Sequence, residues 1–222
     1  MTTTTRRRAT RKEEMAARVL DRFGTTWASE TGFTVRDAPS PLFRLLCLSM
    51  LLSARISNEL AVRGARALTV AGWTTARKMV DSTWADRART LNESGYARFD
   101  ERTARMLEDS SRLLLDRWKG DLRKLREEAG REQPAERALL KEFKGIGDVG
   151  VDIFFREVQG VWGELSPFVD ERARKAAQRL GLGSQPRAIA SLVAAEDLPR
   201  FVAGLVRVDL EHAYDDVLES SS

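Results

Sequence analysis

The chain has 222 residues, of which 42% are hydrophobic and 32% charged, and its formal net charge is +4. This composition is typical of a soluble globular protein with one large or two small domains, and no apolar run approaches the length of a membrane span. The single cysteine, Cys47, excludes an intrachain disulfide and a cysteine metal cage. The mild excess of basic residues permits a nucleic-acid partner without establishing one.

Residues 1–12 carry five basic residues and no acid. We expect a disordered basic tail there, which is either a solvated tail or an arm attracted to DNA. The segment has no apolar stretch of the kind that a secretory signal needs, and its clustered arginines form no amphipathic face, which leaves a mitochondrial presequence as the less favoured alternative. With a single thiol, the protein is expected in the reducing cytoplasm. In that setting Cys47 is expected to be a small buried hydrophobe.

From residue 13 onward apolar residues recur mainly at helical spacing, and sustained period-two alternation is nearly absent, so we predict an all-α protein. The segment "GTTWASETGFTVRDAPSP" is expected to be a loop, and the apolar run "LFRLLCLSMLLSA" a central buried helix. Ser57 is expected to cap the next helix. The other expected helices cover 13–23, 74–81, 84–92, 100–118, 121–129, 134–143, 148–159, 168–181, 186–195 and 198–218.

The stretch "FKGIGDVGVDIF" at 143–154 places a Gly-Ile-Gly turn between two expected helices. In one interpretation this is an ordinary helix corner that uses glycine for its positive φ. In the other, the N–H groups of the turn point outward beside the positive end of the second helix and bind a phosphate, while Ile146 turns inward. Asp148 would cap the second helix or stand in its first turn.

A second motif, "FVDERARKAAQRLGL", places Asp170 just before a basic amphipathic helix, where its side chain could be a helix cap. The order of "LLSARIS", "SGYARFDERTARML", "LLKEFKGIGDVGVDIF" and this motif resembles the helix-hairpin-helix DNA glycosylases of the endonuclease III superfamily. The resemblance covers roughly residues 37–182. Phe143 and Lys144 stand where the family has Leu-Pro.

The resemblance implies an all-α fold of two lobes. A six-helix barrel lobe carrying the hairpin would cover 37–162, and a second helical lobe would combine 13–36 with 163–222. The nucleotide that is acted on would be flipped out of the duplex, because a glycosidic bond inside the base stack is out of reach.

The resemblance also implies roles for individual residues. The hairpin N–H groups of Ile146, Gly147 and Val149 would hold one DNA phosphate, with Gly145 shaping the turn. Lys144 and Lys141 would add positive charge, and Asp148 would point away. These contacts position the DNA without reading its sequence.

Asp170 aligns with the catalytic aspartate of the family. A carboxylate there can stabilise an oxocarbenium-like sugar and orient or deprotonate a water molecule. Its role as a plain helix cap is the alternative.

Several departures from the family pattern narrow the range of reactions that the resemblance implies for this chain. Val149 occupies the position of the lyase lysine, and valine cannot form a Schiff base. The four cysteines that hold an iron–sulfur cluster in many members are missing, so no cofactor and no metal are expected. Ser49 aligns with the glutamate of the adenine-specific branch, which disfavours that branch.

Two positions align with elements that enter the duplex. Arg55 aligns near the glutamine that fills the gap left by a flipped base, and it could intercalate or be a surface arginine at a helix end. Tyr96 or Phe99 could be a wedge that probes the DNA. Trp73, Trp84, Trp118 and Trp162 are expected to pack in the core or within a lobe, with base stacking as the alternative.

Three functions are compatible with these residues. The first is a monofunctional DNA glycosylase of base excision repair that acts as a monomer, associated with the nucleoid, on double-stranded DNA containing a damaged base. The second is a helix-hairpin-helix protein that binds damaged or distorted DNA without cutting it. The third is an unrelated all-α regulator, in which the order of motifs is coincidence. The lesion is not encoded by any one motif.

Overall fold

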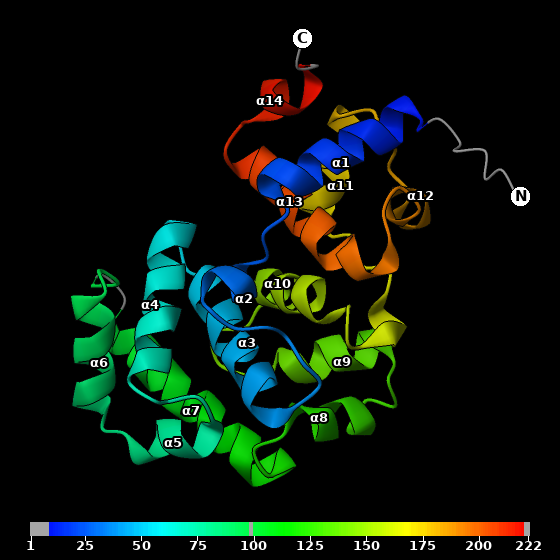
Figure 1. Cartoon of the computed structure of the whole chain (residues 1–222). Coiled ribbons are helices and arrows are strands. Elements are labelled where there is room, and N and C mark those ends of the chain that lie inside the picture. The colour runs from blue at the N-terminus through cyan, green and yellow to red at the C-terminus, as the bar shows by residue number, and fades with distance from the viewer. Residues whose placement is uncertain (1–8, 98–99, 220–222) are drawn as a thin grey trace, which may run out of the picture. The chain divides into compact units, whose positions relative to one another are not determined.

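The computed structural model describes residues 9–97 and 100–219, and within these residues it contains helices and no strand (Figure 1). The prediction of an all-α protein is therefore confirmed. The elements are α1 (Arg11–Phe23), α2 (Trp27–Glu30), α3 (Pro39–Leu52), α4 (Asn58–Val70), α5 (Ala76–Asp81), α6 (Trp84–Glu93), α7 (Asp100–Trp118), α8 (Leu122–Glu128), α9 (Gln133–Leu140), α10 (Asp148–Val158), the 3-10 helix η1 (Gly163–Leu165), α11 (Glu171–Arg179), α12 (Pro186–Ala190), the 3-10 helix η2 (Ala195–Asp197), α13 (Leu198–Leu210) and α14 (Tyr214–Leu218).

The chain divides into two compact units, and their boundaries differ from the expected lobes. Unit 1 contains the chain up to residue 26 and from residue 167 onward, and unit 2 contains 27–166, so 27–36 belongs with unit 2. The reason is the buried carboxylate of Glu157 in α10, which accepts hydrogen bonds from the backbone N–H groups of Trp27 (3.0 Å) and Ala28 (3.1 Å). It thereby satisfies the free donors at the start of α2. The expectation of an uninterrupted loop in this segment was wrong.

Helix α1 begins earlier than expected, at Arg11. Thr10 accepts a hydrogen bond from the N–H of Glu13, and the Glu13 carboxylate accepts one from the N–H of Thr10. This reciprocal capping box fixes the helix start, so residues 10–12 are ordered, contrary to the expectation for the segment 1–12. Residues 1–8 lie outside the described part.

The expected helix over 198–218 is divided into α13 and α14. His212 adopts a left-handed backbone conformation with φ 55°, which ends the first helix. The N–H of Ala213 then bonds to the carbonyl of Val208 at 3.0 Å. Helical periodicity continues across this turn in the sequence, so the pattern alone did not indicate the break.

Unit 2 has α3 at its centre, as its apolar composition predicts. It packs against α4 and α10, and its side chains from Leu42 to Leu51 are almost all buried. Burial raises the pKa of the Cys47 thiol to about 12, so this cysteine remains a neutral, unreactive core residue.

Two of the four tryptophans that were expected to pack in the core or a lobe are fully buried, whereas Trp73 is half-buried and Trp84 more exposed. Trp118 and Trp162 are 2% and 0% exposed, whereas Trp84, in unit 2, is 38% exposed. Trp84 is therefore only partly buried and packs at the edge of the unit, with Nε1 bonded to the carbonyl of Glu101.

Helix α7 is anchored by an arginine that has no exposure to solvent. The guanidinium of Arg87, on α6, donates to the carbonyl oxygens of Met79 (2.9 Å), Ser82 (2.7 Å) and Ala104 (3.1 Å) and pairs with Glu108. These partners lie on or beside α5 and on α7. A buried charge is tolerated only when its donors are satisfied, so Arg87 ties three helices together through their backbones.

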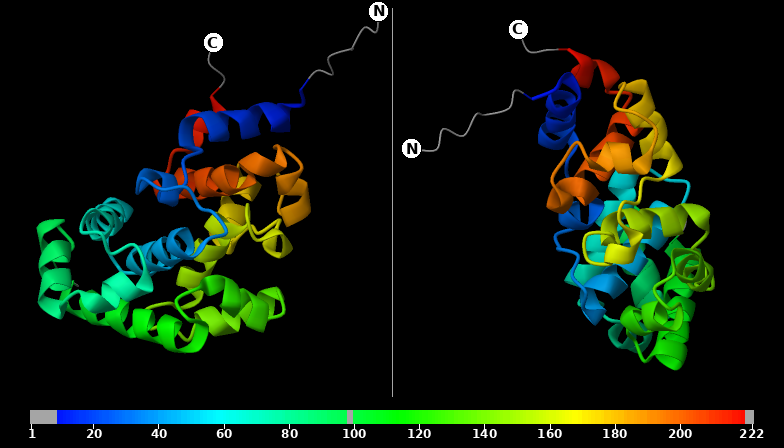
Figure 2. Two further views of the ribbon diagram at one scale, coloured as in Figure 1. Left: turned by 60° about the horizontal axis from the view of Figure 1, so that its bottom comes forward. Right: turned by 90° about the vertical axis from the view of Figure 1, so that its right-hand side faces the viewer.

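In unit 1, α13 packs against both α1 and α11 (Figure 2). Gly204 permits the first of these contacts, because a Cβ there would lie 2.9 Å from Cγ1 of Val19. The side chains of Arg200 and Arg207 donate to the carbonyl oxygens of Gly24 and Thr25, each at 2.9 Å. These contacts place the N-terminal segment and the C-terminal helices in one unit.

A buried carboxyl group lies between α8, α9 and η1 in unit 2. Glu136 has 0% exposure, and neither of its oxygens receives a hydrogen bond from any described residue. Burial, followed by the neighbouring Glu164 carboxylate, raises the pKa of Glu136 to about 8. The Arg126 guanidinium lies close but is held by Glu164 at 2.6 Å and by Asp37 at 3.2 Å. The raised pKa favours the protonated, neutral form of Glu136 in the folded protein.

This arrangement predicts that the protein loses stability as the pH rises. The pKa of Glu136 is higher in the folded than in the unfolded chain, so the folded state binds the extra proton between pH about 4.5 and about 8. The free energy of unfolding should fall across that window by at most about 1.4 kcal/mol per pH unit from this group. Glu136→Gln should remove this part of the pH dependence and raise the melting temperature at pH 8 more than at pH 5.

Thermal unfolding followed by circular dichroism between pH 5 and pH 9 measures this effect. Glu127→Gln, which removes an exposed carboxylate of α8, is the matched control and should leave the profile unchanged. Superimposable profiles for wild type and Glu136→Gln would show that Glu136 does not hold a proton in the folded protein.

Candidate nucleic-acid interface and catalytic carboxylate

The hairpin between α9 and α10 is built around Gly145, Ile146 and Gly147. Gly145 has φ +87°, a conformation that side chains disfavour, and Gly147 is the N-cap of α10 in an extended conformation. Ile146 is 5% exposed and lies inward, as expected. Its N–H donates to the carbonyl of Phe143 at 3.0 Å, so it is already used within the turn. The expectation that this N–H is available to a phosphate is therefore corrected.

The two glycines of the turn serve different purposes. A Cβ at Gly145 would lie 2.9 Å from Sδ of Met106 on α7 and 3.0 Å from Cγ of Met50 on α3. A Cβ at Gly147 would meet nothing within 4 Å. Gly145 therefore lets the turn sit against its supporting helices, whereas Gly147 faces open space. The first N–H groups of α10, including that of Val149, have no partner within the helix by geometry.

The hairpin is held on unit 2 by two further contacts. A Cβ at Gly150 would lie 2.8 Å from Oγ of Ser53, which shows how closely α10 approaches the end of α3. The hydroxyl of Ser110 on α7 donates to the carbonyl of Lys144 at 3.2 Å. Helices α3 and α7 thus fix the position of the turn.

The lysines of the hairpin are each paired with a carboxylate. Nζ of Lys141 lies 2.9 Å from Oδ1 of Asp148, and Nζ of Lys144 lies 3.1 Å from Oδ2 of Asp109. The hydrogen bond from Lys141 lowers the pKa of Asp148. Asp148 is the first residue of α10 and makes no cap bond, so it acts as a partner of Lys141.

Val149 and Arg55 both have exposed side chains. Val149, in the first turn of α10, is 63% exposed, which is unusual for a valine. Arg55 lies in the turn that follows α3 and begins at Ser53, beside Gly150. No described residue forms an ion pair or hydrogen bond with the Arg55 guanidinium. The structure therefore brings Val149 and Arg55 to the neighbourhood of the hairpin turn.

Tyr96 does not fit the role of an exposed wedge. Its side chain is 2% exposed, and its hydroxyl lies 3.5 Å from the carbonyl oxygen of Leu51. The ring packs beside Gly64, where a Cβ would lie 3.4 Å from Cδ2 of the tyrosine. Tyr96 is therefore a core residue that packs against α3 and α4. The turn before it brings the chain back to these two helices. The other candidate wedge, Phe99, lies outside the described residues.

Asp170 belongs to unit 1, where it caps α11. Its Oδ1 accepts hydrogen bonds from the N–H groups of Arg172 (3.0 Å) and Ala173 (3.1 Å), and the residue is 6% exposed. The cap interpretation of this residue is thus confirmed. Capping also fixes the direction of the carboxylate, so it does not exclude a catalytic role.

Helix α7 contributes contacts to the hairpin that the sequence patterns did not indicate. Met106, Asp109 and Ser110 all contact the hairpin or its lysine, and their spacing places them on one face of the helix. Periodicity could have grouped these residues. It could not have shown that the hairpin is their partner, because the contact joins segments about 35 residues apart.

Among the residues that the structure describes, no group of three or more histidine, cysteine, aspartate or glutamate side chains is arranged to hold a metal ion. None of the described helices is both long enough and apolar enough to cross a membrane.

Comparison with solved structures gives a fold likeness. The chain is similar to endonuclease III in a structure of a trapped covalent intermediate with DNA, the estranged-adenine complex. The TM-score is 0.54 with 15% sequence identity, over 95% of this chain and 86% of that chain. The chain has an endonuclease III-like fold. No family model matches it, and no curated protein does.

At this identity the likeness concerns the fold alone. It agrees at that level with the resemblance carried by the motif order, from "LLSARIS" to "FVDERARKAAQRLGL". The endonuclease III-like fold therefore accounts for the helical architecture, while activity has to be argued from this chain's own residues.

The different surroundings of the two hairpin glycines predict different tolerance to substitution. Gly145→Ala combines a left-handed backbone with a clash against Met106, and it should destabilise the protein by about 1–3 kcal/mol. Gly147→Ala, in an extended conformation and open space, should cost less than about 1 kcal/mol. Urea unfolding of the two variants measures the difference. Equal destabilisation would contradict the packing of the turn against α3 and α7.

Proposed function

We propose that this protein is a monofunctional DNA glycosylase of base excision repair. It hydrolyses the N-glycosidic bond of a damaged base that has been flipped out of double-stranded DNA. The observation that carries the proposal is the capped carboxylate of Asp170, at the place where the motif order puts the catalytic aspartate, in a chain with an endonuclease III-like fold.

In this mechanism the hairpin of unit 2 supplies the grip on DNA. The open side of Gly147 lets a backbone phosphate approach the free N–H groups at the start of α10, where the helix dipole favours negative charge. Lys144 adds a positive charge, which a phosphate would share with Asp109. Such contacts hold the duplex without reading its bases.

Asp170 supplies the chemistry. The oxygen of a water molecule attacks C1′ of the deoxyribose as the bond between C1′ and the base nitrogen breaks. The negative carboxylate stabilises the positive charge that develops on the sugar and accepts a proton from the water. That proton passes through solvent to the departing base nitrogen, which restores the carboxylate. The two backbone N–H groups that hold Oδ1 orient the carboxylate before the substrate arrives.

Val149 supports the monofunctional assignment. It stands at the position of the lyase lysine, and a valine offers no amine to attack C1′. The product is then an intact abasic site, and water is the only co-reactant. We further propose that the protein acts as a monomer in the cytoplasm, associated with the nucleoid.

The alternative is a non-catalytic protein that binds damaged or distorted DNA. The hairpin geometry serves this function equally well, and the capping role of Asp170 explains that residue without chemistry. The two functions differ in one result, the release of a base.

The carboxylate of Asp170 can be tested without disturbing its capping role. Asparagine is as good an N-cap as aspartate, so Asp170→Asn should fold like the wild type. It should reduce base release by at least about a hundredfold, and it should leave DNA affinity unchanged or slightly higher because a negative charge is lost. The measurement uses duplexes that carry alkylated, oxidised or deaminated bases, followed by alkaline cleavage of abasic sites.

Two outcomes of that experiment would overturn parts of the proposal. Undiminished base release by Asp170→Asn would remove Asp170 from the chemistry. If the wild type binds lesion-bearing duplexes and releases none of the bases, the non-catalytic function is the correct one.

The position of Val149 allows a gain-of-function test. The wild type should form no adduct with its substrate under borohydride, because no Schiff base exists to be reduced. Val149 is 63% exposed, so a lysine fits there without burial of its charge. Val149→Lys should therefore form a trapped protein–DNA adduct, whereas Val149→Arg, with the same charge and no nucleophilic amine, should not.

An adduct with the wild type would show that another amine attacks the sugar, and the monofunctional assignment would fail. Base release by Val149→Lys without any trapped adduct would show that this position does not face C1′.

A further inference from the structure

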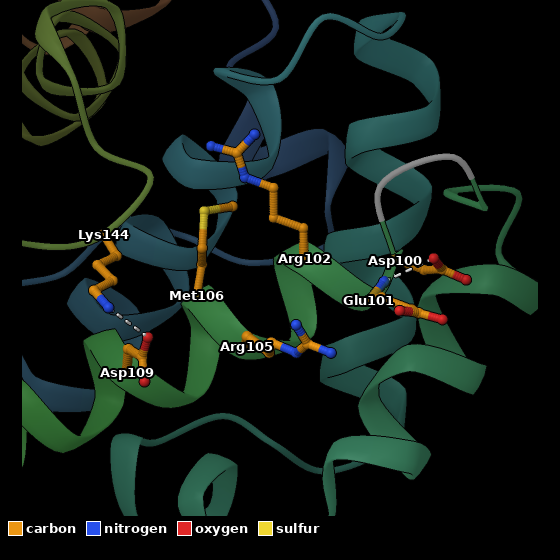
Figure 3. A pocket seen from close by; sticks show the side chains of 7 residues that line it. All are labelled: Asp100, Glu101, Arg102, Arg105, Met106, Asp109 and Lys144. Atoms are coloured by element: carbon orange, nitrogen blue, oxygen red, sulfur yellow. Dashed lines mark hydrogen bonds and ion pairs between the residues drawn. The ribbon is translucent and has the colours of Figure 1, made fainter.

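A polar pocket of about 580 Å³ lies beside the hairpin in unit 2 (Figure 3). It is formed by the first half of α7 together with Lys144 of the hairpin. The residues that matter for its charge and shape are Asp100, Arg102, Arg105, Met106, Asp109 and Lys144.

The carboxylates of the pocket are largely occupied. Oδ1 of Asp100 accepts a hydrogen bond from the N–H of Glu101 at 2.7 Å, and Oδ2 accepts one from the side chain of Asn92 at 2.8 Å. Asp109 is paired with Lys144 at 3.1 Å. Glu101 also lines the pocket, but its side chain extends toward Asp100 and away from Lys144 (Figure 3).

The arginines, in contrast, lack carboxylate partners. Arg102 is exposed, extends alongside Met106, and forms no ion pair or hydrogen bond with any described residue (Figure 3). Arg105 is exposed and lies over the ring of Trp84, with 5.6 Å between Cζ and the ring centroid. The indole of Trp84 is in turn fixed by a hydrogen bond from Nε1 to the carbonyl of Glu101 at 3.3 Å. A guanidinium on an aromatic face keeps its donors free for an anion.

We propose that this pocket is a second phosphate-binding site for the DNA strand that the hairpin grips, with Arg102 and Arg105 as its ligands. The proposal rests on the proposed function, since it takes the same DNA as its partner. The pocket adds contacts between arginines of α7 and the phosphate backbone of the DNA. These contacts are separate from those of the free N–H groups of α10.

The spacing along α7 matches the DNA backbone. Arg102 and Asp109, the partner of Lys144, are seven residues apart, which corresponds to about 10 Å along the helix axis. The path of one strand winds around the duplex, so neighbouring phosphates lie farther apart than the axial rise of about 3.4 Å, and about 10 Å separates phosphates one or two nucleotides apart. One strand that follows α7 can therefore place one phosphate at the hairpin and another at Arg102.

The pocket is also fixed relative to the hairpin. Met106 stands between the arginines and the turn and lies against Gly145, and Ser110 bonds to the carbonyl of Lys144. Arg87 holds the other side of α7 through the carbonyl of Ala104. The arginines are thus presented from a helix that cannot shift without disturbing the hairpin, so little ordering is needed when DNA binds.

Binding of a labelled undamaged duplex, measured by fluorescence anisotropy at several salt concentrations, tests the site. Arg102→Gln and Arg105→Gln should each reduce the slope of log K against log salt by about 0.9 and weaken binding by about five- to tenfold near 0.1 M salt. Arg102→Lys, which keeps the charge, should keep the slope. Lys124→Ala removes an exposed cation that follows the far end of α7, and it should change neither quantity.

A further variant separates the failure of this inference from the failure of the proposed function. Gly147→Val adds a side chain on the open face of the hairpin and should weaken binding through the N–H groups of α10. If Gly147→Val weakens binding and both arginine variants bind like the wild type, the pocket is not a phosphate site and the hairpin function stands. If the wild type does not bind duplex DNA, both proposals fall. Circular dichroism confirms that each variant is folded.

Discussion

The close seating of one turn on two helices is the constraint on which the candidate interface of unit 2 depends. At Gly145 there is no room for a Cβ between the turn and the side chains of Met106 and Met50, and at Gly150 there is none beside Ser53. The backbone of the hairpin therefore touches α3 and α7 directly. This contact determines where the start of α10 points, which side of Gly147 is open, and where Lys144 meets α7. The left-handed conformation of Gly145 is the local cost of this arrangement, and only glycine adopts it readily.

Charge around the hairpin is balanced rather than simply positive. Lys141 and Lys144 are each paired with an aspartate at the surface, and such exposed pairs are worth little in free energy. A phosphate can therefore replace the aspartate of either pair at a small cost in free energy. Anions in solution, in contrast, meet a surface whose net charge is close to zero. Among the described residues of unit 2, Arg55, Arg102 and Arg105 have no carboxylate partner, and a guanidinium has the geometry for bidentate contact with phosphate. Backbone N–H groups and arginines, more than lysines, would then provide the grip.

Sequence patterns predicted the features that depend on residues close to one another along the chain. The apolar run of α3 indicated a buried helix, the Gly-Ile-Gly turn indicated a hairpin with Ile146 inward, and Asp170 was predicted as a helix cap. The errors concern contacts between distant segments. Glu157 caps α2 from 129 or more residues away, which moves the unit boundary. Tyr96 is buried because it packs against α3 and α4. The residues next to it in the sequence do not indicate this contact.

The same distinction explains why the site was only partly predicted. A residue whose role follows from its own backbone, such as Asp170 at the start of α11, can be found from a motif. Arg102 and Arg105 cannot be found from a motif, because their lack of carboxylate partners depends on which residues surround them after folding. Two arginines in a run with four acids, residues 100–109, are typical of an ordinary solvated helix face. In the folded unit, Asp100 is occupied by Asn92 and Asp109 by Lys144, and the remaining positive charge faces a pocket beside the hairpin. The balance of charge on this surface is therefore a property of the tertiary structure, decided by which carboxylates find partners inside the protein.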